Sequence, residues 1–496
     1  MKFFRFWLGI GLFVAGLCVP AKAAKRLAPA LEEQFTVAQL REDCRVLRAA
    51  LEQLHAGLYL HTSHKEMDKA LDELSDSFNK PATRREFYLR AAPVVELAKC
   101  GHTYFDLPQR TLDALGNKRE MFPLPLIFLG GRVHVDQTVG PIPLGAEIKS
   151  INRRPMTEIL RQLMPYVRAD GRNVTMKHRI LDMEFSFHYL VNIGGSIMFE
   201  VDYLPHGKHE AQTVRLAGVN GETLREELTQ RHTNTGRKKN YSFRELGNST
   251  ALLTVNSFDV GARRKGRQKY HDFLKKTFAD LKAKPGIKNL IVDVRENEGG
   301  VEGRETRLFG FLAQKPFRDP ALASTLTLEI PLEKYMDRRE LDRRTEKFIE
   351  KDLAKDFKPN LAANNQLQLA DTPLRKPRDD AFKGRLWILT GGLTHSGGAT
   401  LCSLAANNDN VTFVGEETGG NRFAYTAGNT ILFRLPHTLC QLGVPIILYR
   451  NQTPVGNFPK DRGIIPDHPV TRTIADLRAS EDTVLRRTLE LIKKSE

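Results

Sequence analysis

Two segments of the chain, about a hundred residues apart, each have the pattern of a buried strand that ends in paired glycines. The first runs from Asn289 to Gly300, and the second runs from Leu386 through Ser396 to Gly398. Apolar, β-branched runs are typical of buried strands, and glycines let backbone amides approach a ligand closely. A serine at one strand-to-helix junction, facing glycines at the end of a neighbouring strand, predicts a nucleophile beside an oxyanion site. Two ordinary strand ends with tight turns are the alternative.

The first residues of the chain have the pattern of a secretory signal. A charged start with Lys2 and Arg5 precedes the apolar run Phe6–Val19, and Ala21 and Ala23 form a small-x-small cleavage site. The sequence therefore predicts a signal peptide over 1–23 and an exported protein, periplasmic or extracellular, without a stable membrane span after cleavage. An uncleaved anchor is the alternative.

A lipid anchor at Cys18 is disfavoured, because Leu17 before it is bulkier than such processing prefers.

The net charge of +16 raises the question of a polyanionic partner. Removal of residues 1–23, which hold three basic and no acidic residues, lowers this charge to +13. The remaining basic residues are interspersed with acidic ones, as in Arg338–Arg344, a pattern typical of a solvated helix face. We therefore expect no binding of nucleic acid, and a polyanion-binding envelope protein is an alternative that rests on net charge alone.

Cysteine usage gives little sign of a metal site. After residues 1–23, the chain keeps Cys44, Cys100, Cys402 and Cys440, with no Cys-x-x-Cys and no metal-like spacing. We expect no metal and no organic cofactor. Disulfides and free buried thiols both remain open.

A chain of 496 residues with 41% hydrophobic content predicts a multidomain α/β protein. Residues 24–119 have helical periodicity from about Val37, and Ser63–Glu66 has the form of a capping box that opens a helix. Residues 120–225 alternate short apolar runs with glycines and prolines, as a β-rich module does. Strand and helix patterns then alternate over 236–496, interrupted by a charged insertion over 320–383 that includes a helical pattern through Phe357. The polar stretch Asn220–Lys239 is interpreted as a connector.

Ser396 is the main candidate nucleophile. It follows an apolar strand and precedes helix-forming residues, so its hydroxyl lies near the positive end of a helix dipole, and the amide of Gly397 is free to meet an oxyanion. A serine that serves only as N-cap is the alternative. The sequence has no Gly-x-Ser-x-Gly, His-Glu-x-x-His or phosphate-binding loop.

Four motifs in order resemble those of the S41 peptidases, the family of C-terminal processing proteases and the tricorn core protease. They are Asp293–Gly300, the segment around Ser396, Val414–Gly420 and Gly463–Asp467. Further back, Gly101-His102-Thr103 is similar to the family's Gly-His-Thr element, and Gly145–Pro155 to part of its PDZ-like module. The resemblance implies a crotonase/ClpP-like ββα catalytic core, a PDZ-like module over 120–225 and the N-terminal helical region.

The resemblance also implies roles for particular residues. Ser396 is the implied nucleophile, and the amides of Gly397 and of Gly299 or Gly300 are the implied oxyanion donors. The processing proteases use a lysine as base, but Asn421 follows the Thr-x-Gly element here. In the tricorn-like branch a histidine activates the serine, and His102 has that position.

His102 is preferred as the base over its rival His395, because neighbouring side chains on a chain usually diverge. The pKa of a free imidazole, about 6.5, leaves it mostly neutral near pH 7. The tricorn-like branch places a glutamate where this chain has Lys460, so the expected carboxylate is missing. Asp461 or Glu417 could substitute, or the site could work as a dyad.

Four further polar residues lie in these motifs. Asp293, Arg295 and Asn297 either orient the substrate or form a structural network. Asp467 follows a proline in a late turn and is interpreted as structural.

The sequence thus predicts an exported serine endopeptidase that acts on peptides or unfolded proteins, with Ser396 as nucleophile and His102 as general base. A catalytically inactive, peptide-binding relative is the alternative. The oligomeric state is left open.

Overall fold

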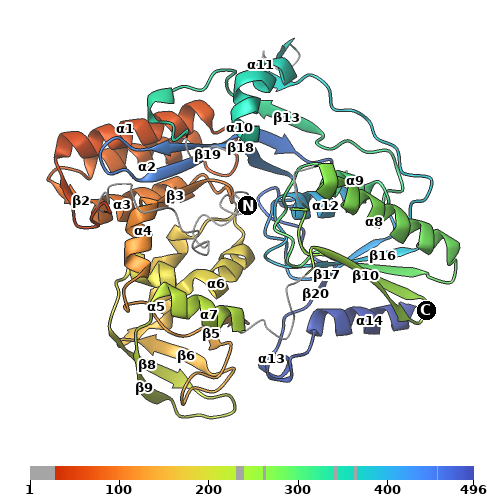
Figure 1. Cartoon of the computed structure of the whole chain (residues 1–496), viewed down its shortest axis with the longest axis horizontal. Coiled ribbons are helices and arrows are strands. Elements are labelled where there is room, and N and C mark those ends of the chain that lie inside the picture. The colour runs from red at the N-terminus through yellow and green to blue at the C-terminus, as the bar shows by residue number, and fades with distance from the viewer. Residues whose placement is uncertain are drawn as a thin grey trace.

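A computed structural model describes residues 28–230, 239–260, 264–338, 343–361, 366–454 and 456–495 (Figure 1). The predicted signal peptide and Cys18 lie outside these residues. Within the described ranges, no helix combines the length and the apolar character that crossing a membrane requires.

The first sheet carries both glycine-ended strands, in the order β10-β11-β12-β16-β17-β20. Successive pairs from β11 to β20 are parallel, whereas β10 is antiparallel to β11. Asp293 is paired with Leu389, so the carboxyl ends of β12 and β16 lie at the same edge of the sheet. The strands are β10 (Tyr241–Gly247), β11 (Thr250–Val255), β12 (Asn289–Asp293), β16 (Arg385–Thr390), β17 (Val411–Gly415) and β20 (His468–Pro469).

Helices cover both faces of this sheet, as its buried parallel strands require. Alternate residues of β12 enter different apolar clusters: Leu290 and Val292 pack with α8 residues, whereas Ile291 shares a cluster with Ile492 of α14. The covering helices are α8 (Arg264–Ala283), α9 (Arg304–Phe309), α12 (Gly397–Ala405) and α14 (Thr483–Ser495), with the short α13 (Ile474–Ala479) before α14.

The second sheet joins distant parts of the chain, in the order β14-β15-β13-β19-β18, with β3 also paired to β19. The predicted insertion supplies three of its strands. The members are β3 (Tyr104–Asp106), β13 (Leu322–Thr325), β14 (Phe357–Asn360), β15 (Gln366–Leu369), β18 (Ala424–Arg434) and β19 (Gln441–Arg450). Between β13 and β14 lie α10 (Arg343–Lys347) and α11 (Leu353–Asp356).

The third sheet forms a separate layer in the order β4-β5-β6-β8-β9, with β7 paired to β6. Its strands are β4 (Leu126–Leu129), β5 (Arg132–Val135), β6 (Glu147–Ile151), β7 (Arg154–Pro155), β8 (Met198–Leu204) and β9 (Gln212–Ala217). The helices of this part of the chain are α5 (Met156–Leu163), α6 (Val174–Asn192) and α7 (Gly221–Gln230). Apolar residues of α5 and α6 share one buried cluster with these strands.

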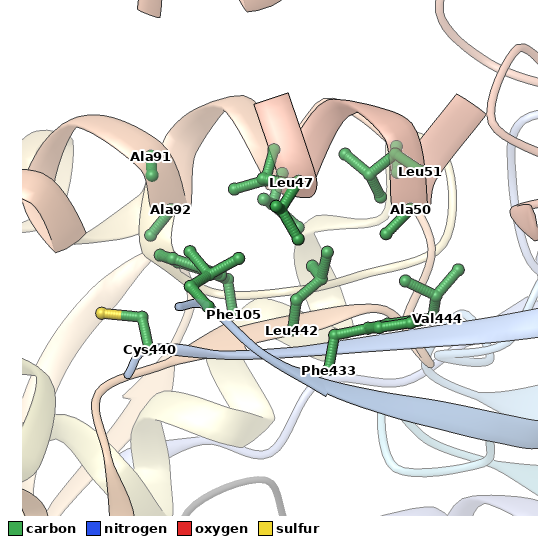
Figure 2. Close-up of a cluster of buried hydrophobic side chains, with 14 of the residues drawn as sticks. Leu47, Ala50, Leu51, Ala91, Ala92, Phe105, Phe433, Cys440, Leu442 and Val444 are labelled. Atoms are coloured by element: carbon green, nitrogen blue, oxygen red, sulfur yellow. The ribbon is translucent and has the colours of Figure 1, made fainter. Parts of the chain in front are cut away.

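The N-terminal helices pack on the second sheet, so the red and blue parts of Figure 1 lie together. Figure 2 shows this buried cluster, in which Leu47 and Leu51 of α1 and Phe105 of β3 lie with Leu442 and Val444 of β19. The helices are α1 (Val37–Leu54), α2 (His64–Asp76), α3 (Arg84–Glu96) and α4 (Gln109–Gly116), and the short strands β1 (Gln34–Phe35) and β2 (Ala82–Thr83) pair with each other.

The structure is a multidomain α/β fold with several sheets. Half of the predicted capping box is confirmed: the Ser63 side chain accepts a hydrogen bond from the amide of Glu66, but the return bond from the Ser63 amide to the Glu66 side chain is not formed. Two local predictions were wrong. The connector beginning at Asn220 contains α7, and Phe357 begins strand β14, where it fills the cluster beneath the N-terminal helices.

Candidate active site

Ser396 stands between the end of β16 and the first turn of α12. Its backbone angles are φ 49° and ψ −125°, a conformation that costs a non-glycine residue on the order of 1–3 kcal/mol. Such strain is found where a side chain must be held in a special direction. Gly397 is the first residue of α12, so its amide has no acceptor within the helix. The junction therefore combines a sharply turned serine with an amide free to bind an anion.

Gly299 lies directly against this serine. A Cβ at Gly299 would come within 2.8 Å of Ser396 Cβ and 3.1 Å of its Oγ, and φ at Gly299 is 99°. The amide of Gly299 donates to Asn297 Oδ1 at 2.9 Å. The amide of Gly300 has no acceptor among the described residues. Of the predicted oxyanion donors, the amides of Gly397 and Gly300 therefore remain available. Gly299, which has no side chain, allows its loop to lie against Ser396.

Asn297 stabilises the strand-to-helix junction at Ser396 through buried hydrogen bonds. Its side chain is fully buried and donates to Val255 O at 3.0 Å, and its carbonyl accepts from the amide of His395 at 3.0 Å. These bonds tie β11, the glycine loop and the serine segment together. Of the two roles left open for Asn297, the structural one fits this geometry.

The rings of His102 and His395 come together although the two residues are far apart in sequence, and both residues line the same cavity as Ser396. Their ring centroids are 4.5 Å apart, and His102 follows α3 in the segment that leads into β3. Thr103 is held by a 2.7 Å hydrogen bond to Nε2 of His55. Burial, followed by the neighbouring charge of His395, lowers the pKa of His102 to about 3. His102 is therefore neutral near pH 7, the state in which an imidazole accepts a proton.

Asp170 is the site residue that the sequence analysis missed. It is only 2% exposed and accepts hydrogen bonds from the amides of Gly101, at 2.7 Å, and Asn421, at 3.1 Å. Its Oδ2 lies 3.4 Å from His395 Nε2. Burial raises the pKa of Asp170, but the hydrogen bond and charge of His395 outweigh this effect and hold it well below its usual value. An ionised carboxylate thus lies behind the histidine pair.

The segment that carries Asp170 is hydrogen-bonded to two distant parts of the chain. Gly171 donates to Lys99 O at 2.8 Å, and Asn173 Nδ2 donates to Thr418 O at 2.6 Å. Asn173 also caps α6 through the amide of Met176. The Asp-Gly-x-Asn pattern of residues 170–173 is a turn followed by a helix cap, and this was the available sequence signal.

The substitutes proposed for the missing carboxylate are engaged elsewhere. Glu417 accepts from Arg462 Nε at 2.8 Å and from the amide of Gly463 at 2.9 Å, whereas Asp461 pairs with Arg172. Lys460 is exposed, and its ammonium lies 5.0 Å from the centre of the Phe423 ring. Asp170 is the carboxylate that the fold brings to the histidines instead.

Asp293 and Arg295 form a structural network. Arg295 binds Asp293 through Nε at 2.9 Å and Nη2 at 2.7 Å, and it also pairs with Asp482 just before α14. Asp467 accepts from the amide of Phe413 at 2.8 Å, which fixes the late turn to β17. These contacts hold the edge of the sheet rather than a substrate.

One cavity of about 830 Å³ opens over the junction and is here called the active-site cavity. It is lined by residues from the sheet edge, the N-terminal segment, the insertion and β18, among them His102, Gly299, Gly300, His395 and Ser396. The sequence-predicted site residues thus share one concave surface, except that Gly397 lies in the helix beneath it.

A possible metal cluster lies behind the same site. Ligand atoms of Cys100, His102 and Asp170 lie within 4.8 Å of one another. Burial raises the pKa of the Cys100 thiol to about 12, and its Sγ donates to Thr426 O at 3.2 Å. A protonated thiol is a poor metal ligand, so the donor set fits a metal badly. The four described cysteines are all free and buried.

Comparison with known proteins identifies the part of the chain that carries Ser396. Residues 249–470 match the sequence model of peptidase family S41, and this range includes both glycine segments. This part of the chain belongs to peptidase family S41. The protein is therefore a serine-type peptidase by family, as predicted. No curated protein matches the chain.

Two solved structures of CPAF show the same fold over nearly the whole length. Mature CPAF is 12% identical with a TM-score of 0.59, and the alignment covers 89% of this chain and 94% of that one. Its complex with lactacystin has a TM-score of 0.60 and coverages of 92% and 98%. The photosystem II D1 C-terminal processing protease is 13% identical with a TM-score of 0.41, covering 88% and 92%. His102 and Asp170 lie outside the residues that match the S41 model.

Proposed function

We propose that this S41 protein is an exported serine endopeptidase, with Ser396 as nucleophile, His102 as general base, and the amides of Gly397 and Gly300 as oxyanion donors. The observation that carries the proposal is the convergence on one cavity of a strained serine, a partly buried neutral histidine and glycine amides. Family membership over residues 249–470 supports the reaction class.

The geometry suggests how a peptide bond is cleaved. Ser396 Oγ attacks the peptide carbonyl carbon while its proton moves to the imidazole of His102. The carbonyl oxygen becomes an oxyanion that accepts from the two amides, and the protonated His102 then gives its proton to the leaving amine. Water, activated in the same way, releases the acyl group from Ser396.

His395 and Asp170 support the base rather than replace it. His395 is 3% exposed, and its Nε2 is directed at the Asp170 carboxylate. The ring of His102 stacks on that of His395. We assign both residues to orienting His102 and to stabilising its protonated form, because a carboxylate behind an imidazole does both.

The proposal also covers the surrounding parts of the chain. The crotonase-like core corresponds to the first sheet with its helices, and the PDZ-like module to the third sheet with α5 and α6. Strands β4 and β9 end the strand order of that sheet, so they are the candidates for pairing with an extended peptide. Export to the periplasm or the extracellular space rests on the signal pattern of residues 1–23.

The test compares the chain lacking residues 1–23 with three variants on casein. Ser396→Ala and His102→Ala are expected to lower the rate at least about a thousandfold, whereas His206→Ala, a histidine on an exposed turn of the third layer, keeps it. A fluorophosphonate, which phosphonylates activated serines, is expected to label the parent chain but not Ser396→Ala. Equal rates for the parent and Ser396→Ala would leave the peptide-binding alternative.

A further inference from the structure

The active-site cavity is acidic although the chain carries a net charge of +16. Its basic lining residues are Arg168 and Lys347, and Lys347 already lies 3.5 Å from Asp352. Glu184 is paired with His188 at 3.6 Å. Six further carboxylates line the cavity: Asp259, Glu296, Glu298, Glu302, Asp352 and Asp356. Acidic lining in a basic protein focuses a negative potential where the substrate enters.

Glu298 is the carboxylate that stands closest in sequence to the oxyanion segment. It directly precedes Gly299, lines the cavity, and makes no hydrogen bond or ion pair with any described residue. Desolvation raises the pKa of Glu298 to about 7, although the charges of His395 and Arg168 act in the opposite direction. Glu298 is only partly exposed, and a carboxylate that is partly withdrawn from water without a hydrogen-bond partner is costly, so a bound cation lowers that cost.

Other buried acids near the site are satisfied from within the fold. Glu305 accepts from the amide of Gly303 at 2.8 Å, and Asp319 accepts from the hydroxyl of Thr306. Arg168 lines the active-site cavity and also a smaller cavity that is lined by Asp106 and Glu184, so its charge faces those acids too. Glu298 has no hydrogen bond of this kind, and the fold supplies it only with the charges of His395 and Arg168.

We propose that the active-site cavity selects peptides that carry lysine or arginine, with Glu298 binding one basic side chain beside the scissile bond. The acids on the insertion, Asp352 and Asp356, attract further basic residues of the same peptide. This specificity rests on the proposed function, because it places the basic side chain next to the bond that Ser396 attacks.

The catalytic test uses two fluorogenic peptides that differ only at one central position, lysine or the neutral, nearly isosteric norleucine. The parent chain is expected to show a kcat/KM ratio of about ten or more in favour of lysine at low salt, falling as salt screens the charges. Glu298→Gln is expected to bring the ratio close to one. Glu158→Gln, an acid on α5 outside the cavity lining, keeps the parent ratio. A parent ratio near one, or an unchanged ratio in Glu298→Gln, would overturn the proposal.

A binding test separates this proposal from the proposed function. Fluorescence anisotropy with Ser396→Ala measures the affinity of both peptides without cleavage, and tighter binding of the lysine peptide is expected. If the parent chain cleaves nothing but this preference holds and is lost in the Ser396→Ala/Glu298→Gln double variant, the specificity survives and the catalytic role fails. Equal binding of the two peptides overturns the specificity alone.

A second pair of variants provides a further test in case Glu298→Gln folds poorly by circular dichroism. The double variant Asp352→Asn/Asp356→Asn is expected to show a reduced lysine preference, and an unchanged preference would count against the proposal.

Discussion

Asp170 is held by groups from three separate segments of the chain. The amides of Gly101 and Asn421 and the ring of His395 all meet its carboxylate. These three contacts belong to the histidine motif, the Thr-x-Gly motif and the serine motif, respectively. The Asp170 carboxylate therefore holds these three segments in fixed positions relative to one another. It also supplies the negative charge behind the two imidazoles.

Asp170→Asn is expected to lower kcat on a neutral peptide about a hundredfold or more, because the amide cannot stabilise a protonated histidine. Removing the charge of Asp170, which raises the pKa of His102, is also expected to move the acidic limb of the kcat profile to lower pH. Asp461→Asn, a partly exposed acid paired with Arg172, is the control and keeps both properties. A loss of thermal stability without any change in kcat or in the pH profile would reduce Asp170 to a structural residue.

The pH dependence of the parent chain follows from the lowered pKa of His102. A general base works unprotonated, so activity rises with pH through its pKa and is retained above it. With that pKa lowered to about 3, kcat/KM for the norleucine peptide is expected to be flat from about pH 7 down to about pH 5. Using an uncharged peptide keeps the titration of Glu298 out of the result. A fall that begins near pH 6.5, with the fold intact by circular dichroism, would mean that a histidine with an ordinary pKa is the base.

At the scale of elements, the loop between β12 and α9 and the start of α12 form one unit. Gly299→Ala places a Cβ against Ser396, whereas Gly303→Ala in the same loop meets nothing within 4 Å. Both glycines have positive φ, 99° and 81°, so both variants carry similar backbone strain. Only Gly299→Ala is expected to lower kcat, by about a hundredfold or more, because it displaces Ser396, the proposed nucleophile, and the Gly397 amide. Equal losses in the two variants would assign the effect to strain alone.

Sequence reasoning reached the elements whose signals are local. The apolar runs of β12 and β16, the helix that begins after Ser396 and the cap at Ser63 all follow from neighbouring residues. Asp170 was missed because its role comes from contacts with residues far away in the chain. The strands of the insertion were missed for the same reason, since β13 gains its order from pairing with β19. The buried helix α6 also contains polar residues, which weaken the helical periodicity of its apolar residues.

At the scale of the whole molecule, the N-terminal helices and the C-terminal strands share one buried core. Leu47→Ala in α1 is expected to cost about 2–5 kcal/mol of unfolding free energy. Trp387 in β16 is the single tryptophan outside residues 1–23, and it packs in a different cluster. If the molecule unfolds cooperatively, Leu47→Ala shifts the Trp387 fluorescence transition together with the circular dichroism transition. Leu326→Ala, at a half-exposed side chain, is the control. A Trp387 fluorescence transition that does not shift in Leu47→Ala would show that the N-terminal core and the cluster around Trp387 unfold independently.

Because β3 pairs with β19, this protein can complete its fold only after its C-terminal strands have been synthesised. Phe105 lies opposite Leu442, so a segment that is synthesised early can form this strand pairing only after a segment that is synthesised late. Until β18 and β19 emerge, the apolar faces of α1 and α3 have no sheet to cover them. Exposed apolar surface of this kind is what chaperones bind and what drives nascent chains to aggregate. A ribosome that stalls before Ala424 therefore releases a chain with an uncovered N-terminal half, and complete synthesis becomes a condition for assembling the catalytic site.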